Sequence, residues 1–230
     1  MAGLGRKVFT AGDVLTASDV QNYLMDQTVM NFAGTAARSS AIATPTTGMT
    51  TYNQTTQQLE SYNGSAYVGM SGLQLVKKQT VGSGVTSVAV TNAFSATYEN
   101  YKIIYTGGTA SANAHIGLSL TGSATGYSSF MVYGEFNTNT VLGAGLSNFS
   151  SILYAGSAQI NEIAVLNCEV MQPFLAKFTR FSSVATSQTA TSTGTTTGIH
   201  AVATSYTGCT ISVNSGTLTG GTIYVYGYGT

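Results

Sequence analysis

The spacing of apolar residues changes along the chain, and near the N-terminus it has a helical period. Apolar side chains recur there about one helical turn apart, at Val20, Tyr23, Leu24 and Met30. Ser18 and Gln21 stand at the spacing of a capping box, in which each side chain bonds the other residue's backbone amide. This pattern predicts a helix over about residues 19–31. A second short helical turn is expected over 35–42, where Thr44-Pro45 then ends it.

Beyond this second turn the period changes to two, which is typical of strands. Short strands are expected over 49–52, 57–62 and 67–69, with Asn63-Gly64 as a hairpin turn between the last two. One helix and a small β-meander bury little apolar surface of their own. Residues 1–72 are therefore expected to form a small N-terminal module that docks on another protein or trimerises.

The remaining chain, residues 73–230, is rich in β-branched and aromatic runs bounded by Gly, Ser, Thr or Asn. These runs are 85–90, 101–105, 116–120, 130–133, 163–171, 174–181, 199–203, 211–213 and 223–228. About nine strands with no helical period between them predict an antiparallel β-sandwich or jelly roll. The expected fold class is mainly β, with the small helix and meander module before the sandwich.

One low-complexity stretch, residues 182–198, consists mainly of Ser, Thr, Ala and Gly. Its composition is that of a flexible linker. Strands are expected directly on both sides of it, however, so we interpret it as a β-structured loop or an edge strand, with the linker as the alternative.

Composition excludes several classes of partner. Charged residues are 7% of the chain, and the formal net charge is zero. A neutral chain has no electrostatic footprint for nucleic acid or for an anionic membrane. No apolar run reaches the length of a membrane-spanning helix, so membrane insertion is not expected. Hydroxyl groups replace charge as the polar component, which suits a subunit that works inside an assembly.

The sequence offers little for catalysis. All three aspartates precede residue 27, and the β domain carries only Glu99, Glu135, Glu162 and Glu169 as acids. No G-x-S-x-G motif introduces a nucleophile, and no phosphate-binding glycine motif is present. We therefore expect no catalytic residues, no cofactor and no metal site, and a protein that is not an enzyme.

The two cysteines and the two histidines are interpreted as structural residues. Cys168 and Cys209 each alternate with apolar neighbours, which predicts buried free thiols in the core. His200 is expected at a polar strand position or a loop contact. His115 lies opposite the apolar face of its strand, so it points to solvent or to a partner subunit. This makes His115 a candidate for surface recognition.

Tyrosine is the enriched candidate for binding, with 14 copies and no tryptophan. In the last strand Tyr224, Tyr226 and Tyr228 alternate with Ile223 and Val225, so the three rings share one face. Such a stripe offers flat apolar area with a hydroxyl at its rim, useful against sugars or a neighbouring chain. The alternative is that these rings pack inside the sandwich or in a subunit interface.

Several segments resemble known proteins. FTAGDVLTASDVQNYLMDQ, residues 9–27, resembles the N-terminal segment of tailed-bacteriophage virion proteins that are described as tail fibres or minor tail proteins. The segment LESYNGSAYV, residues 59–68, is similar to a continuation of that module, with Tyr67 where relatives often have Trp. YENYKI at 98–103 and GGTIYVYGY at 220–228 resemble the C-terminal domains of such proteins.

The resemblance implies an N-terminal module that attaches to other virion proteins and a distal β-sandwich, together forming a homotrimer. The expected function is that of a tail-associated fibre or adhesin. It would be anchored through residues 1–72, and its β domain would contact a host cell-surface glycan or protein. The alternative is a capsid-decorating or head-fibre protein with the same parts. A remote alternative is a glycan-degrading enzyme of the tailspike type.

Overall fold

The structure is a computed structural model of the chain, and it describes residues 10–20, 29–70, 72–186, 189 and 191–229. The chain divides into two compact units, one ending at Gly72 and one spanning Leu73–Tyr228. Each unit has its own sheet, so the two are described separately.

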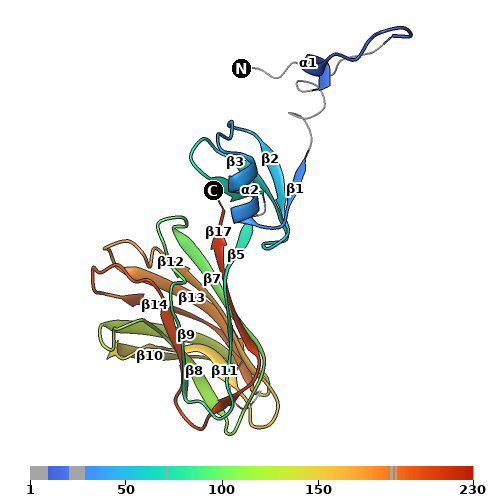
Figure 1. Cartoon of the computed structure of the whole chain (residues 1–230). Helices are drawn as coiled ribbons and strands as arrows, with labels where there is room; N and C mark the ends of the chain where they lie inside the picture. Colours follow the sequence, from blue (N-terminus) through green and yellow to red (C-terminus); the bar gives the residue numbers. More distant parts are fainter. Residues whose placement is uncertain (1–9, 21–28, 71, 187–188, 190, 230) are drawn as a thin grey trace. The chain divides into compact units, whose positions relative to one another are not determined.

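The N-terminal unit combines short helices with a four-stranded sheet (Figure 1). Its elements are α1 (Ala17–Asp19), β1 (Met30–Phe32), α2 (Thr35–Ala41), β2 (Thr50–Asn53), β3 (Gln58–Tyr62) and β4 (Tyr67–Gly69). The order is β1-β2-β3-β4, and β2, β3 and β4 form the expected antiparallel meander. Strand β1 pairs with β2 in parallel, which the sequence pattern did not predict.

The predicted helix over 19–31 is wrong at both ends that the structure describes. Helix α1 begins two residues earlier, because Thr16 caps it: Thr16 Oγ1 accepts from the Asp19 amide at 3.1 Å, and Asp19 accepts from the Thr16 amide at 3.1 Å. At the other end, Met30 is in a strand because its backbone pairs with β2. Residues 21–28 of the prediction lie outside the described part of the chain. The second helical turn, α2, is confirmed.

The hairpin predicted at Asn63-Gly64 is confirmed, with a longer loop than the dipeptide suggests. Tyr62 pairs with Tyr67, so four residues form the turn. The Asn63 side chain accepts from the amides of Ser65 and Ala66 at 3.0 and 2.9 Å, and Gly64 takes the positive φ of 101°. Of the two residues in the motif, Gly64 alone needs the left-handed conformation.

The buried centre of the N-terminal sheet is polar. Arg38 of α2 forms an ion pair with Glu60 of β3, and both side chains are about 90% covered. Asn53 and Thr56 donate to Glu60 Oε1 at 3.2 and 3.1 Å, and the Arg38 guanidinium lies 3.8 Å from the centre of the Tyr67 ring. Fully buried charges need such partners because their desolvation is costly. This small sheet is therefore organised around one hydrogen-bonded cluster.

The second unit consists of strands joined by loops. They are β5 (Leu73–Thr80), β6 (Ser87–Val90), β7 (Asn100–Ala110), β8 (Ala114–Leu120), β9 (Tyr127–Glu135), β10 (Val141–Phe149), β11 (Ile152–Ala158), β12 (Ala164–Met171), β13 (Thr179–Thr186), β14 (Ser192–His200), β15 (Cys209–Val213), β16 (Leu218–Thr219) and β17 (Thr222–Tyr228).

These strands form an antiparallel β-sandwich of two unequal layers (Figure 1). The larger layer has the order β5-β17-β7-β12-β13-β14-β9-β10, and the smaller has β6-β15-β8-β11. The layers are joined because β11 pairs with β8 along one side and with the start of β12 along the other. The predicted fold class, mainly β with an antiparallel sandwich, is confirmed.

The core between the layers is apolar and includes three buried tyrosines. Tyr101, Tyr105 and Tyr127 are at most 1% exposed, and each hydroxyl finds a backbone partner. Tyr105 donates to the Gly220 carbonyl at 2.9 Å, and the Leu120 amide donates to Tyr127 at 2.7 Å. The hydroxyl group of each ring thus has a hydrogen-bond partner inside the sandwich. Cys168 and Cys209 are free, fully buried members of this core, as predicted.

Within 182–198, residues 182–186 and 192–198 are β structure, in strands that lie inside the sheet and not at its edge. They contribute to β13 and β14, which pair with each other from Thr179–His200 to Thr186–Thr193, and each has a further neighbour, β12 or β9. Interior position helps so hydroxyl-rich a segment to form strands, since β14 is paired on both sides and β13 is paired on both sides over residues 180–183. The predicted strands 174–181 and 199–203 are shifted relative to β13 and β14. Strands β5, β10, β11 and β16 had not been predicted.

Candidate functional site

The outer face of the larger layer presents side chains in registered rows across the sheet. Pairing places Tyr226, Lys102, Glu169, Ser182, Thr197 and Phe130 in one row that crosses six strands. A second row contains Met171, Arg180, Ile199 and Ser128. Because side chains of a strand alternate between faces, all of these residues lie on the side away from the core.

The three candidate tyrosines of β17 lie on this outer face. Tyr224 and Tyr226 are half-buried and stack at 6.3 Å between ring centres, while Tyr228 is 36% exposed. Lys78 of β5 lies 5.7 Å from the Tyr224 ring centre. The rings therefore do not pack inside the sandwich of one chain, although a subunit interface stays open as their role.

The end of the tyrosine stripe is tied to a charged cluster. Tyr228 donates to Glu169 Oε2, and Lys102 donates to Glu169 Oε1 at 2.9 Å. Burial, and then the neighbouring Glu169 carboxylate, raise the pKa of Tyr228 to about 12. Glu169 is thus already engaged by two neighbours, which makes it a structural acceptor.

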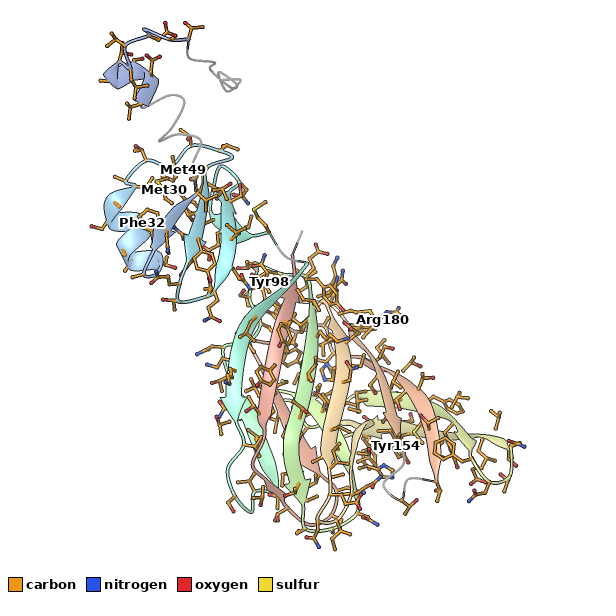
Figure 2. The ribbon with its side chains drawn as sticks, turned by 90° about the vertical axis from the view of Figure 1, so that its right-hand side faces the viewer. Met30, Phe32, Met49, Tyr98, Tyr154 and Arg180 are labelled. Carbon is orange, nitrogen blue, oxygen red and sulfur yellow. The ribbon has the colours of Figure 1, made fainter. Side chains whose placement is uncertain are left out.

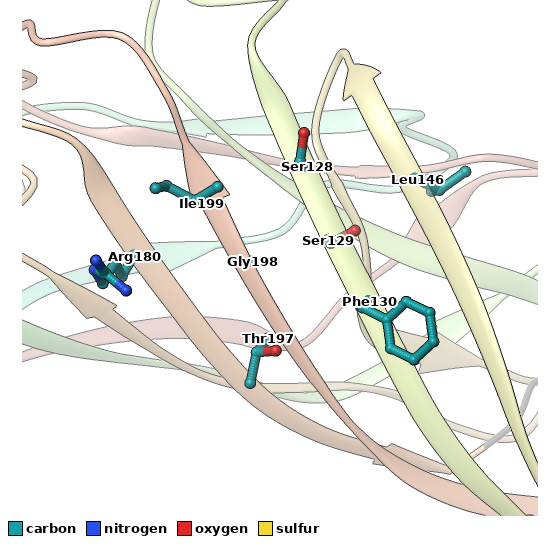
Figure 3. Close-up of a pocket in the computed structure, with 8 residues that line it drawn as sticks. All are labelled: Ser128, Ser129, Phe130, Leu146, Arg180, Thr197, Gly198 and Ile199. Carbon is teal, nitrogen blue, oxygen red and sulfur yellow. The ribbon is translucent and has the colours of Figure 1, made fainter.

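Farther across the same face lies an open groove over β13, β14, β9 and β10 (Figure 3). Its lining residues are Ser128, Ser129, Phe130, Leu146, Arg180, Thr197, Gly198 and Ile199. In Figure 3, Arg180 stands on one side and Phe130 on the other, with Thr197 and Ile199 of β14 between them. The groove combines one cation, one aromatic ring, aliphatic side chains and hydroxyls.

Arg180 carries the charge of this groove. It is exposed, and within the described chain no side chain forms a hydrogen bond or ion pair with its guanidinium. The nearest acid in the registered rows, Glu169, is held by Lys102 and Tyr228. The guanidinium therefore keeps its five donors available for a ligand.

Phe130 is held in place by glycines of the edge strand β10. A Cβ atom built on Gly143 would lie 2.6 Å from the Phe130 ring, and one on Gly145 would lie 3.0 Å from it. The ring therefore lies against bare backbone on one side. It is 52% exposed, so its other side forms a flat apolar platform within the groove.

His115 lies in a different groove. Its side chain is half-buried, contacts Tyr154 of β11 edge-on at 4.8 Å between ring centres, and shares the groove with Tyr133 and Glu135 of β9. Burial lowers the pKa of His115, which leaves the ring neutral at pH 7. Tyr154 is well separated from Arg180 in Figure 2. The structure thus brings the three tyrosines onto one face and places His115 elsewhere.

The other histidine, His200, forms a contact that resembles part of a catalytic pair. Its Nε2 lies 2.8 Å from Ser123 Oγ and 3.1 Å from the Thr125 carbonyl oxygen, and the ring packs at a tilt against Tyr127, 4.4 Å between ring centres. A serine nucleophile needs a base that a carboxylate orients through the second ring nitrogen. His200 Nδ1 is buried and has no hydrogen-bond partner in the described chain, so this orienting group is missing.

Two of the β-domain acids lie in different places on the sandwich. Glu135 and Glu169 line different grooves, and Glu135 accepts a hydrogen bond from Thr138 at 2.9 Å. Among the described residues, no group of three or more His, Cys, Asp or Glu side chains is placed to hold a metal ion.

Arg180 and Phe130 were not singled out from the sequence. A signal for Arg180 was available, since it is the one arginine after residue 72 and alternates with inward-facing Thr179 and Phe181. Phe130 was placed in a strand, but its exposure depends on glycines of a strand that the pattern did not reveal.

Comparison with known proteins gives no match: no family model, no curated protein and no solved structure is similar to this chain. None of the described helices is long and apolar enough to cross a membrane.

Proposed function

We propose that this protein is a non-enzymatic component of a tailed-phage virion, a tail-associated fibre or adhesin. The N-terminal unit attaches to neighbouring virion proteins, and the β-sandwich contacts the host surface. The protein works as a homotrimer and needs no cofactor. The proposal rests on the resemblance of residues 9–27 and 59–68 to phage virion proteins.

The observation that carries the host-contact role is the outer face of the larger layer. It holds an arginine to which no described side chain is paired, an exposed aromatic platform and a tyrosine stripe on one continuous eight-stranded surface. Aromatic rings and arginine are the side chains that most often dominate binding surfaces. Several copies of such a weak site gain avidity when they act together.

A non-enzymatic role is supported by the state of the polar groups. Among the described residues, no carboxylate orients His200 in its contact with Ser123, and Glu169 is occupied by Lys102 and Tyr228. A glycan-degrading enzyme would need two carboxylates facing each other across a cleft. Glu→Gln substitutions at the four β-domain glutamates test the non-enzymatic role. If the purified full chain hydrolyses a polysaccharide and one of these substitutions abolishes the hydrolysis, the non-enzymatic role is contradicted.

The experiment that tests the proposal is localisation of the chain on intact virions with gold-labelled antibodies. We expect label at the tail, and we expect the same antibodies to block adsorption to host cells. Label over the capsid would contradict the tail assignment and favour a capsid-decorating or head-fibre protein. Absence of label from purified particles would contradict a virion role altogether.

A further inference from the structure

We propose that the groove between Arg180 and Phe130 binds a saccharide that carries a carboxylate, a hexuronic acid unit of a cell-surface glycan. This inference rests on the proposed function, because a host-contact domain must recognise some surface chemistry. It names the class of ligand that the groove on the outer face of the larger layer would bind.

The charge of the groove selects an anion. Arg180 is the only charged residue among the eight that line it, and no described side chain neutralises it. Guanidinium groups bind planar carboxylates through two parallel hydrogen bonds. One cation matches one carboxylate, whereas a phosphate monoester at pH 7 would bring nearly twice the charge.

The spacing of the two anchors suits a short saccharide. Arg180 and Phe130 are separated by two strand spacings and by two residues along the strand, because Arg180 pairs with Ile199 and Phe130 with Thr197. Strands about 4.8 Å apart and a rise of about 3.4 Å per residue give roughly 12 Å between the two positions. A disaccharide covers this span, with its carboxylate at Arg180 and a ring face on Phe130.

The floor between the anchors fits a sugar as well. Thr197 and Ser128 offer hydroxyls that can donate or accept, and Ile199 and Leu146 offer apolar contact. Gly198 faces the core, where a Cβ would lie 2.6 Å from Ile152 Cδ1, so the floor is formed by the outward side chains on either side of it, Thr197 and Ile199. Sugar rings present alternating apolar and hydroxyl surfaces of this kind.

The test uses the purified full-length chain and a panel of glucuronate, galacturonate and mannuronate oligosaccharides, each paired with its carboxyl-reduced, neutral counterpart. Binding is measured by calorimetry or by ligand-observed NMR. We expect at least one uronate to bind, and its reduced counterpart to bind about tenfold or more weakly, since hydrogen bonds between charged partners contribute at that level.

Variants assign the binding to this groove. Arg180→Gln should weaken the uronate about tenfold, and Arg180→Lys should restore part of the loss. Phe130→Ala should weaken the uronate and the neutral saccharide alike. Lys78→Gln is the matched control, because it removes a cation from the same face at the tyrosine stripe and should leave affinity unchanged. Melting temperatures check that each variant is folded.

Several results would overturn the inference: no uronate binds, the reduced saccharides bind equally, Arg180→Gln has no effect, or Lys78→Gln weakens binding as much as Arg180→Gln. Each of these is independent of where the chain lies on the virion. If the label lies on the capsid and the uronate still binds, the proposed tail function is wrong and the groove assignment stands. If the label lies on the tail and no uronate binds, the groove assignment is wrong and the tail function stands.

Discussion

The buried ion pair of the N-terminal unit makes that unit sensitive to loss of either partner alone. Arg38→Ala would leave the Glu60 carboxylate buried beside Asn53 without its cation. Removing one partner of a buried pair costs about 3–5 kcal/mol. We expect loss of amide hydrogen-exchange protection in β2 and β3, measured by mass spectrometry on the full chain.

The matched control for this pair replaces both partners. Arg38→Met combined with Glu60→Leu leaves no uncompensated charge, so protection of β2 and β3 should be greater than in either single variant. Unchanged protection in Arg38→Ala would show that the pair contributes little.

Tyr228 gives a prediction about pH. Its pKa of about 12 in the fold lies above the ordinary value of 10, so the folded state keeps a proton that the unfolded state loses. The stability linked to Tyr228 is therefore complete below about pH 10 and is lost as the pH rises through about 12. Solvent screening keeps this contribution small because the side chain is partly exposed.

Glu169→Gln tests the cause of this shift. Without the carboxylate, the pKa of Tyr228 should fall toward 10, with burial retaining part of the rise. Tyrosinate absorbance during an alkaline titration measures the change, and Tyr228→Phe identifies which part of the signal belongs to this residue. A titration curve identical to that of the unaltered chain would be inconsistent with the contact.

Individual residues were predictable where one strand decides their position. The burial of Cys168 and Cys209 and the shared face of Tyr224, Tyr226 and Tyr228 follow from alternation within a single strand, and alternation also sets His115 apart from its apolar neighbours. The Arg180 groove does not follow in this way, because its residues come from four strands whose order across the sheet the sequence does not state. The same holds for the cap of α1, where Thr16 and Ser18 are both chemically suitable.

Among the strands, close approach of the backbone at Gly194 gives an element-scale prediction. A Cβ there would lie 2.3 Å from the Val132 carbonyl oxygen and 2.7 Å from Tyr133 Cβ. Gly194→Ala should push β14 away from β9 and destabilise the sandwich by about 1–3 kcal/mol. Denaturant unfolding of the full chain measures the loss.

Gly134→Ala is the matched control on the adjacent strand. A Cβ on Gly134 meets no atom within 4 Å, so the alanine should be neutral or slightly stabilising. Equal effects of the two substitutions would mean that close approach at Gly194 is not what limits the strand.

Strands were predicted correctly where their own side chains favour β structure. They were missed where pairing with a neighbouring strand determines that the segment is a strand. Runs such as 101–105 and 223–228 are β-branched or aromatic, and they are central strands β7 and β17. Strand β10, with its glycines, has weak strand propensity, and the Thr- and Gly-rich start of β14 has no alternation of apolar and polar residues to mark it. They are strands because long antiparallel partners complete their hydrogen bonds.

At the scale of the whole molecule, the three sheet edges of the sandwich differ in protection. Strand β6 is short, and β5 carries Lys77 and Lys78 beside an irregularity in its pairing. Strand β10 has nine residues and no charge, and Val141 in it is 72% exposed. Long uncharged edges invite pairing with another chain. Copies of this chain are therefore expected to meet along β10.

Light scattering on the purified chain tests this assembly. We expect a mass of three times 23.7 kDa, and Val141→Lys should shift the population toward monomer because a lysine on the edge opposes strand addition. Thr80→Lys on the β5 edge is the control and should leave the mass unchanged. A monodisperse monomer at micromolar concentration would contradict the homotrimer.

The two core thiols have a practical consequence. Burial raises the pKa of Cys168 and raises that of Cys209 to about 12, so neither is a thiolate at neutral pH. A maleimide dye can reach them only after the sandwich opens. The rate of labelling in native buffer therefore reports the rate at which the sandwich opens. A cysteine introduced on the surface can be labelled with a fluorophore while Cys168 and Cys209 stay unlabelled.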